Sequence, residues 1–328
     1  MKEALHETAK ALVSRPRGIL AADESIGTMS SRLEKTGIPV NEENRRAYRD
    51  LLVTTPELHR GISGVILSHE TFYQKLSDGN SFPLGIHSLG VLPGIKVDTG
   101  AKALAGAPGE KVTEGLDGLR ERLADYVPRG ARFAKWRAVI VIGDGKPTEN
   151  ALHANAHALA RYAALCQEAW VVPIVEPEVL MDGDHTIERC AEVTRETLTA
   201  LMAELDLARV DLAGTVLKPN MVVPGSACSQ QATPEEVAEQ TVATLRAVLP
   251  DSLAGVAFLS GGQSPETATA NLAAMQKLET PWPLTFSFGR ALVDPALKAW
   301  KGDPDQVDAG QHALADRVEA NSAVLVGA

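Results

Sequence analysis

Residues 215–220 read TVLKPN, an apolar run that ends on Lys218 immediately before Pro219. Threonine, valine and leucine in sequence suit the end of a buried strand, because β-branched and aliphatic side chains fit a pleated surface. A lysine at such a place is either a solvated surface residue or a group that the strand carries into a site. Which of the two applies depends on what the other apolar runs of the chain carry at their ends.

Seven further apolar runs are bounded by glycine, proline or polar residues in the same way. They are GILAAD from Gly18, GVILS from Gly64, LPGIKVD from Leu92, RFAKWR from Arg132, VVPIVEPE from Val171, GVAFLSGG from Gly255 and LTFSFGR from Leu284. Consecutive runs begin roughly 28 to 46 residues apart, which leaves room for one strand, one helix and two loops. Eight such units predict an α/β protein folded as a (β/α)8 TIM barrel. A doubly wound open sheet is the structural alternative.

The segments between these runs carry helix signals. A stripe of apolar side chains at helical spacing runs through Leu152, Ala156, Leu159, Ala163 and Cys166. Residues 233–236 read TPEE, a capping box with proline at the first helical position. We expect a single domain over residues 1–328, with an N-terminal helix at about 1–14 and a short tail after about residue 320, because no linker or low-complexity tract interrupts the pattern.

The composition excludes several classes of protein. The 328 residues are 45% hydrophobic and 23% charged, with only 4% aromatics and a formal net charge of −10. Such a chain repels nucleic acid and anionic membrane surfaces, so we expect neither as a partner. Three cysteines without metal-ligand spacing favour a reducing compartment, and neither a signal peptide nor a membrane span is evident. We therefore expect a cytoplasmic protein that binds a small molecule.

Charged residues recur where the predicted strands end, which in a barrel is where the active site forms. The strand ends carry Asp23, Lys96, Lys135 with Arg137, Glu176 with Glu178, Lys218, Ser260 with Gly261, and Gly289 with Arg290. Residues two apart on a strand face the same side, and inward-facing charge is costly unless it is partnered. Charges of both signs gathered at one end of a barrel would partner one another. We therefore interpret them as one functional site and not as isolated ion pairs. Burial and the nearby cation of Lys135 should then lower the pKa of Lys218, which would make its amine a nucleophile.

Other motifs indicate a phosphate site and exclude a cofactor. The loops after the last two strands, SGGQS and FGR, are the usual place for phosphate in a barrel. The pair His153 and His157 resembles a metal motif but lacks its glutamate, and GDGKP from Gly143 lacks the full phosphate-loop pattern, so we interpret them as a solvated helix flank and a turn. No GxGxxG follows a strand. We expect neither a metal nor an organic cofactor.

Nine motifs in order between about residues 18 and 300 carry a resemblance to a known family. They are AADES, NEENRRAYRDLL, GIKVD, FAKWR, PIVEPE, DGDH, LKPNMV, FLSGGQS and FSFGRAL. With them the chain resembles the class I fructose-bisphosphate aldolases, the metal-independent Schiff-base type. The resemblance implies an eight-stranded α/β barrel, often a homotetramer, that reversibly cleaves fructose 1,6-bisphosphate to dihydroxyacetone phosphate and glyceraldehyde 3-phosphate in glycolysis and gluconeogenesis. A Schiff-base aldolase for another ketose phosphate, such as sedoheptulose bisphosphate, and a non-catalytic phosphosugar-binding scaffold are the alternatives.

The resemblance also implies a role for each matching residue. Lys218 matches the lysine that forms the Schiff base, and Glu176 the carboxylate that shuttles protons. Asp23 matches the group that deprotonates the C4 hydroxyl, and Lys135 a lysine that positions the substrate. Supporting contacts fall to Arg137 and Glu178, the C1 phosphate to Ser260, Gly261, Gly289 and Arg290, and the C6 phosphate to Ser25, Thr28 and Lys96.

The chain departs from the vertebrate members of that family at two places. Phe288 stands where they have tyrosine, which should be tolerated because backbone groups and Arg290 make the phosphate contact. The sequence also ends at Ala328 without their long tail and terminal tyrosine, which assist proton transfer at the enamine. We therefore expect turnover and ketose preference to differ from those of the vertebrate enzymes.

Overall fold

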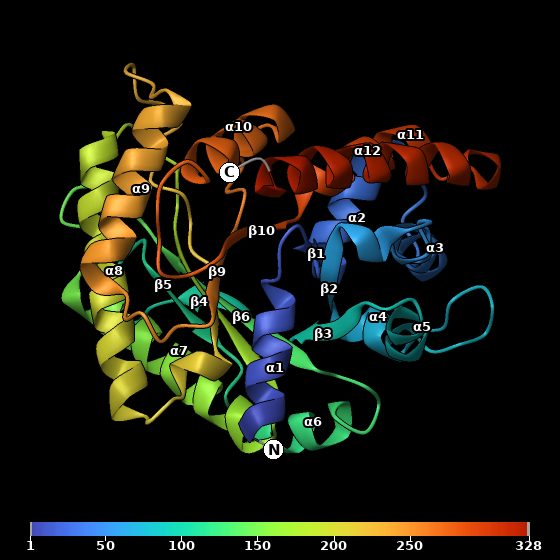
Figure 1. The fold of residues 1–328 in the computed structure, drawn as a ribbon, viewed down its shortest axis with the longest axis horizontal. Helices are drawn as coiled ribbons and strands as arrows, with labels where there is room; N and C mark the ends of the chain where they lie inside the picture. The colour runs from blue at the N-terminus through green and yellow to red at the C-terminus, as the bar shows by residue number, and fades with distance from the viewer. Residues whose placement is uncertain (1, 327–328) are drawn as a thin grey trace.

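Eight parallel strands form a closed barrel at the centre of the molecule, in the order β1-β10-β9-β8-β7-β6-β3-β2 (Figure 1). The computed structural model describes residues 2–326. The barrel strands are β1 (Gly18–Ala22), β2 (Ile62–Leu67), β3 (Leu92–Lys96), β6 (Phe133–Ile140), β7 (Val172–Val179), β8 (Val216–Leu217), β9 (Gly255–Phe258) and β10 (Leu284–Phe288). Each predicted apolar run forms one of them. The TIM-barrel prediction is confirmed, and the open-sheet alternative is wrong.

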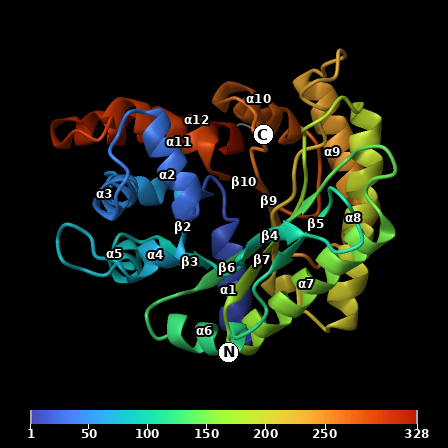
Figure 2. The same ribbon diagram turned by 180° about the vertical axis from the view of Figure 1, so that it is seen from behind.

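Helices surround the barrel, with α7, α8 and α9 along one side and α2, α3, α11 and α12 on the other (Figures 1 and 2). Their bounds are α1 (Lys2–Leu12), α2 (Ile26–Lys35), α3 (Glu42–Val53), α4 (His69–Tyr73), α5 (Phe82–Ser88), α6 (Leu119–Tyr126), α7 (Glu149–Glu168), α8 (Ile187–Leu207), α9 (Pro234–Val248), α10 (Pro265–Met275), α11 (Arg290–Trp300) and α12 (Val307–Val326), with short 3-10 turns η1 (Leu58–Arg60), η2 (Leu212–Gly214) and η3 (Pro304–Gln306). The predicted capping box of Thr233 and Glu236 begins α9. Within residues 2–326, no helix is both long and apolar enough to cross a membrane.

The last helix corrects one expectation about the end of the chain. Helix α12 continues to Val326, past residue 320, where a tail was expected to begin. Leu314, Val318, Asn321 and Leu325 follow one another at helical spacing, and all four are buried. Burial of this stripe stabilises the helical conformation to the end of the described chain.

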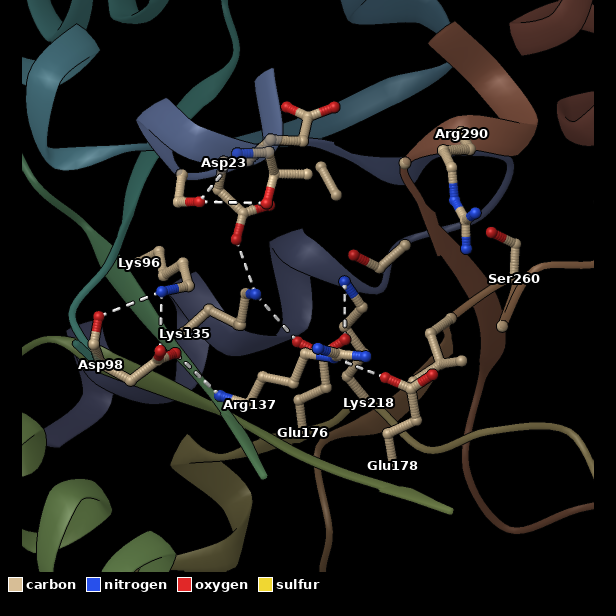
Figure 3. Close-up of a pocket in the computed structure, with 18 of the residues that line it drawn as sticks. Asp23, Lys96, Asp98, Lys135, Arg137, Glu176, Glu178, Lys218, Ser260 and Arg290 are labelled. Atoms are coloured by element: carbon tan, nitrogen blue, oxygen red, sulfur yellow. Dashed lines mark hydrogen bonds and ion pairs between the residues drawn. The ribbon is translucent and has the colours of Figure 1, made fainter. Parts of the chain in front are cut away.

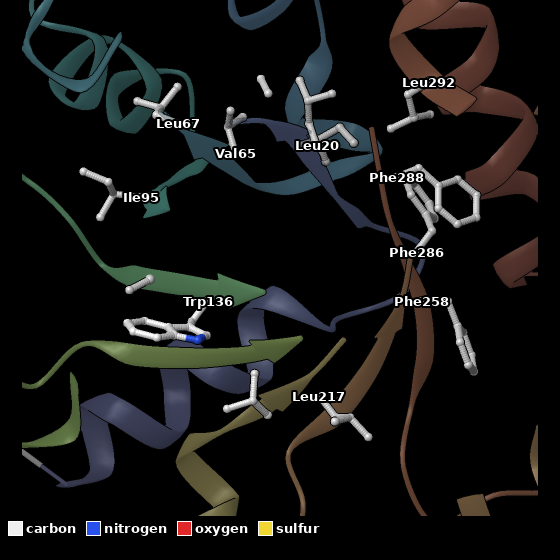
Figure 4. Packing of buried hydrophobic residues seen from close by; sticks show 14 of the residues in the cluster. Leu20, Val65, Leu67, Ile95, Trp136, Leu217, Phe258, Phe286, Phe288 and Leu292 are labelled. Carbon is white, nitrogen blue, oxygen red and sulfur yellow. The ribbon is translucent and has the colours of Figure 1, made fainter. Parts of the chain in front are cut away.

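Side chains alternate between the outer and inner faces of the barrel strands, and this separates two apolar layers. Outward side chains such as Leu20, Trp136, Leu217 and Phe286 pack between the strands and the helices (Figure 4), where each buried large apolar side chain contributes about 1.5–3 kcal/mol. A second cluster fills the lower interior of the barrel and is covered by the apolar face of α1; it comprises Leu5, Ala9, Leu12, Ile19, Ile66, Phe133, Ile174 and Val216 among others. The interior is therefore a packed core at this end.

Glycines in β2 and β3 give Phe133 its space inside the barrel. A Cβ atom at Gly94 would lie 2.3 Å from the ring of Phe133, and one at Gly64 would lie 2.9 Å from it. The large ring seals the interior below the functional end, because the two neighbouring strands leave room for it.

A two-stranded hairpin between β3 and β6 was not predicted. Strands β4 (Gly100–Ala103) and β5 (Lys111–Glu114) pair antiparallel beside the barrel. Thr113 donates its hydroxyl to the carbonyl of Arg137 at 2.7 Å, and the Asn155 amide donates to the carbonyl of Lys111 at 2.8 Å. Strand β4 consists of small residues and one lysine, and β5 is mostly polar, so neither has the run of large apolar residues that marked the barrel strands. The hairpin forms one wall of the barrel mouth.

Candidate active site

A cavity of about 370 Å³ opens at the carboxyl ends of the barrel strands. The structure brings every site residue predicted from the sequence to it. Its lining includes Asp23, Ser25, Thr28, Lys96, Lys135, Arg137, Glu176, Glu178, Lys218, Ser260, Gly261, Gly289 and Arg290. On β6 and β7 the inward face that is apolar in the lower interior becomes charged in the cavity, as in the steps from Phe133 to Lys135 and from Ile174 to Glu176.

Four buried side chains form a continuous chain of alternating charge across the floor of the cavity (Figure 3). Lys135 Nζ lies 2.6 Å from Asp23 Oδ2 and 3.0 Å from Glu176 Oε2. Glu176 Oε1 lies in turn 3.3 Å from Lys218 Nζ. These residues come from β6, β7 and the ends of β1 and β8, and the unbroken register of β6 against β7 sets the middle contact. Two cations and two carboxylates balance one another, which makes their burial tolerable.

The two lysines of this chain have opposite pKa shifts. Burial lowers the pKa of Lys218, and Lys135 lowers it further, while Glu176 opposes both. Lys135 also loses solvation, but Asp23 and Glu176 outweigh the burial and raise its pKa well above the usual lysine value. Lys135 is therefore held as an ammonium, and Lys218 is the lysine better able to become a neutral amine. The predicted direction for Lys218 is confirmed.

Both carboxylates are held ionised. Burial pushes the pKa of Asp23 upward, but Lys135 and Lys218 together bring it below the ordinary aspartate value. Burial likewise raises the pKa of Glu176, and Lys135, Lys218 and Arg137 reverse the effect. Each group can accept a proton once a neighbouring cation loses its charge, because these pKa values depend on each other.

Polar groups lie at two opposite sides of this chain of charges (Figure 3). On one side Lys96 Nζ lies 2.7 Å from Asp98 Oδ1, and Ser25 caps α2 by accepting the backbone N–H of Thr28 at 3.2 Å. On the other side are Ser260 and Arg290, the latter the first residue of α11.

The turn that follows β9 on this second side depends on glycine. Gly261 has φ +56, a left-handed conformation that side chains with a Cβ rarely adopt. Helix α11 directs its first backbone N–H groups toward the same side, and helix N-termini favour anions.

Among the polar and charged residues that line the cavity, sequence reasoning missed four: Glu24, Arg32, Asp98 and Ser287. Asp98 and Ser287 could have been found, since each lies two residues beyond another inward group on the same run. Ser287 Oγ is buried without a hydrogen-bond partner among the residues described. Arg32 pairs with Glu24 and, at 2.6 Å, with Asp294. It lies on helix α2, so the alternation of side chains along strands could not predict it.

The rejected motifs lie away from this cavity. His153 and His157 are exposed on α7, and both contact Glu204, at 3.3 and 2.9 Å. Gly143 and Lys146 form a bridge that closes the expected turn. Across residues 2–326, no group of three or more His, Cys, Asp or Glu side chains is arranged to hold a metal ion.

A lysine amine of lowered pKa, beside a carboxylate and a fixed ammonium at the mouth of a TIM barrel, is suited to an enzyme that forms an imine with a carbonyl substrate. Comparison with known proteins identifies the group more closely. The family model described as fructose-bisphosphate aldolase class-I matches residues 4–328. The chain belongs to this family.

Relatives from three organisms agree with that assignment. The probable fructose-bisphosphate aldolase class 1 of Xanthomonas campestris pv. campestris is 53% identical over 99% of this chain and 98% of its own length. Fructose-bisphosphate aldolase 6, cytosolic, of Arabidopsis thaliana is 53% identical over 95% of this chain and 87% of its own. The fructose-bisphosphate aldolase of Plasmodium falciparum, solved in complex with TRAP and a small molecule inhibitor, superposes with a TM-score of 0.97 at 46% identity, covering 99% of this chain and 94% of that one.

The protein is accordingly a lyase. It cleaves fructose 1,6-bisphosphate in glycolysis, and its class implies a Schiff-base mechanism.

Proposed function

We propose that the chain of charges from Asp23 through Lys135 and Glu176 to Lys218 carries out the aldol cleavage. Lys218 in its neutral form attacks the C2 carbonyl of the open-chain ketose. Glu176, 3.3 Å from the lysine nitrogen, accepts the proton that Lys218 loses on becoming neutral and later donates it to the C2 hydroxyl of the carbinolamine, which leaves as water. The product is a protonated imine, an electron sink that makes the next bond easier to break.

Cleavage follows at the other end of the same chain. Asp23 accepts the proton of the C4 hydroxyl, the C3–C4 bond breaks, and its electron pair moves onto the imine to give a neutral enamine. Glyceraldehyde 3-phosphate leaves, the enamine takes a proton at C3, and water releases dihydroxyacetone phosphate from Lys218. Lys135 supports both halves because it contacts both carboxylates, at 2.6 and 3.0 Å. It stabilises negative charge as the charge shifts between them.

The two polar sides of the cavity suit the two phosphates. We assign the C1 phosphate to the side of Gly289 and Arg290, with Ser260 and Gly261, and the C6 phosphate to the side of Lys96, with Ser25 and Thr28. Arg137 and Glu178 line the same cavity and pair with each other, with Nε and Oε2 2.5 Å apart. The assignment is supported by the separation of the two groups across Lys218 in Figure 3.

We also propose that the chain is one domain, acts in the cytoplasm and forms a homo-oligomer. Two Arabidopsis relatives that are 53% and 52% identical are named cytosolic, which supports the location. Sedimentation of the purified protein would test the assembly.

Borohydride trapping tests the central assignment. Incubation with fructose 1,6-bisphosphate and sodium borohydride should reduce the imine, inactivate the enzyme and leave a three-carbon or six-carbon phosphate adduct on the peptide that contains Lys218. Omission of the substrate is the control and should leave the peptide unmodified. A label on Lys135, or no label in an enzyme that still turns over, would refute the role of Lys218.

A further inference from the structure

We propose that Asp98 is a positioning residue that holds the ammonium of Lys96 in place for the C6 phosphate. The inference rests on the proposed function, because it takes Lys96 as a phosphate contact. Lys96 Nζ lies 2.7 Å from Asp98 Oδ1 and donates to the backbone oxygen of the same residue at 3.1 Å. Two acceptors on one residue thus fix the end of a flexible four-carbon side chain.

Asp98 is itself held by backbone groups on both sides. Its Oδ1 accepts the N–H of Gly100 at 3.0 Å, and its Oδ2 accepts the N–H of Arg137 at 3.1 Å. The side chain is 2% exposed, so water does not compete for these contacts. The carboxylate of Asp98 therefore connects the end of β3, the first residue of the hairpin and strand β6. These three elements together fix where the ammonium of Lys96 binds.

The chemistry of these contacts requires a carboxylate. Both oxygens of Asp98 act as acceptors, toward two N–H groups on opposite sides and an ammonium. An asparagine has one acceptor oxygen, so its NH₂ group would face either the N–H of Gly100 or that of Arg137. It would also lose the charge that attracts Lys96.

The position of Lys96 matters because another carboxylate lies near. Lys96 contributes to lowering the pKa of Asp23, a group that Lys135 already holds at 2.6 Å. An untethered Lys96 could turn toward Asp23 or into solvent, and in both cases the phosphate would lose its contact. Asp98 prevents this while its own charge remains buried behind the lysine.

The test compares two substrates on the full-length enzyme. Fructose 1,6-bisphosphate carries a C6 phosphate and fructose 1-phosphate lacks it, so a fault in placing Lys96 should affect only the first. We expect Asp98→Asn to lower kcat/KM for the bisphosphate by about 10- to 100-fold, mainly through KM, and to change that for fructose 1-phosphate by less than about threefold. Asp98→Ser, a smaller uncharged variant, should give the same substrate ratio. Asp98→Glu keeps the charge and should recover part of the lost kcat/KM for the bisphosphate.

The same Asp98→Asn substitution in a second variant, Lys96→Ala, distinguishes a positioning role of Asp98 from a general structural one. In Lys96→Ala there is no ammonium to place, so adding Asp98→Asn should change the substrate ratio by less than about threefold. The exposed Asp117→Asn, near the end of the same hairpin, removes an equal charge and should leave both substrates unaffected. Equal losses on both substrates, or a full effect of Asp98→Asn in the Lys96→Ala background, would overturn the inference. Failure of the unmodified enzyme to trap substrate on Lys218 would instead refute the proposed function.

Discussion

Replacing Glu176 by glutamine should slow the enzyme severely while leaving substrate binding nearly intact. The change keeps the size of the side chain but removes its contacts as a charged acceptor with Lys218 at 3.3 Å and Lys135 at 3.0 Å. Charge-assisted contacts are worth roughly 1.5–3 kcal/mol each, so the two together amount to about 3–6 kcal/mol. These contacts are made in the free enzyme and therefore bear on its stability, whereas the rate should fall by the ~10²–10⁴-fold contribution typical of a proton-transfer group. The KM should change little, because neither phosphate lies at Glu176 in the proposed arrangement.

Rapid-quench trapping with borohydride locates the slow step. In Glu176→Gln the imine with Lys218 should accumulate more slowly by about the same factor as kcat, since loss of water from the carbinolamine needs the proton. Loss of the Glu176 charge should also lower the pKa of Lys218 further, so a shortage of neutral amine cannot explain the defect. Glu149→Gln, an exposed change on α7, is the control and should be normal. Turnover of Glu176→Gln within about threefold of the unmodified enzyme would contradict the proposed role.

Three further predictions concern the phosphates, metals and acid. Lys96→Ala should lower kcat/KM for fructose 1,6-bisphosphate by one to two decades and spare fructose 1-phosphate, whereas Arg290→Ala should impair both; the reverse pattern would mean that the ketose binds in the opposite direction. A chelator should leave cleavage unchanged in a coupled assay, because the protonated imine takes up the electrons; a loss restored by metal would contradict this. Asp23 and Glu176 have lowered pKa values, so their stabilisation is complete above about pH 5 and is lost as pH falls through the folded values. Glu176→Gln should therefore lose less thermal stability than the unmodified enzyme between about pH 5 and 3, and an equal loss would be evidence against the shift.

Much of the site could be predicted because strand alternation is a local property. Once residues 132–137 are known to form a strand, Lys135 and Arg137 must share a face and Trp136 must take the other, whatever the rest of the fold does. The same holds for Glu176 and Glu178, although Pro177 between them made a regular strand uncertain. Figures 3 and 4 show the two sides of this pattern, with charges in the cavity and Trp136 in the outer core.

The hairpin and the partners of Asp98 could not be predicted, because no local pattern carries these contacts. Strand β4 is built of small residues and one lysine and β5 is mostly polar, and Thr148 and Asn155 anchor the hairpin from a distant part of the chain. Alternation places Asp98 on the same face as Lys96, but the N–H groups of Gly100 and Arg137 reach its carboxylate only in the folded chain.

The sequence by itself determined the eight strands, the helices between them and the residues whose side chains face inward. These follow from periodicity, spacing and turn residues, each of which acts over a few neighbouring positions. Only the tertiary structure decided that Lys135 lies between Asp23 and Glu176, and that Glu176 reaches Lys218. Those distances depend on how the closed barrel aligns one strand against the next, and the same alignment sets the opposite pKa shifts of the two lysines, because burial and neighbouring charge exist only in the folded chain.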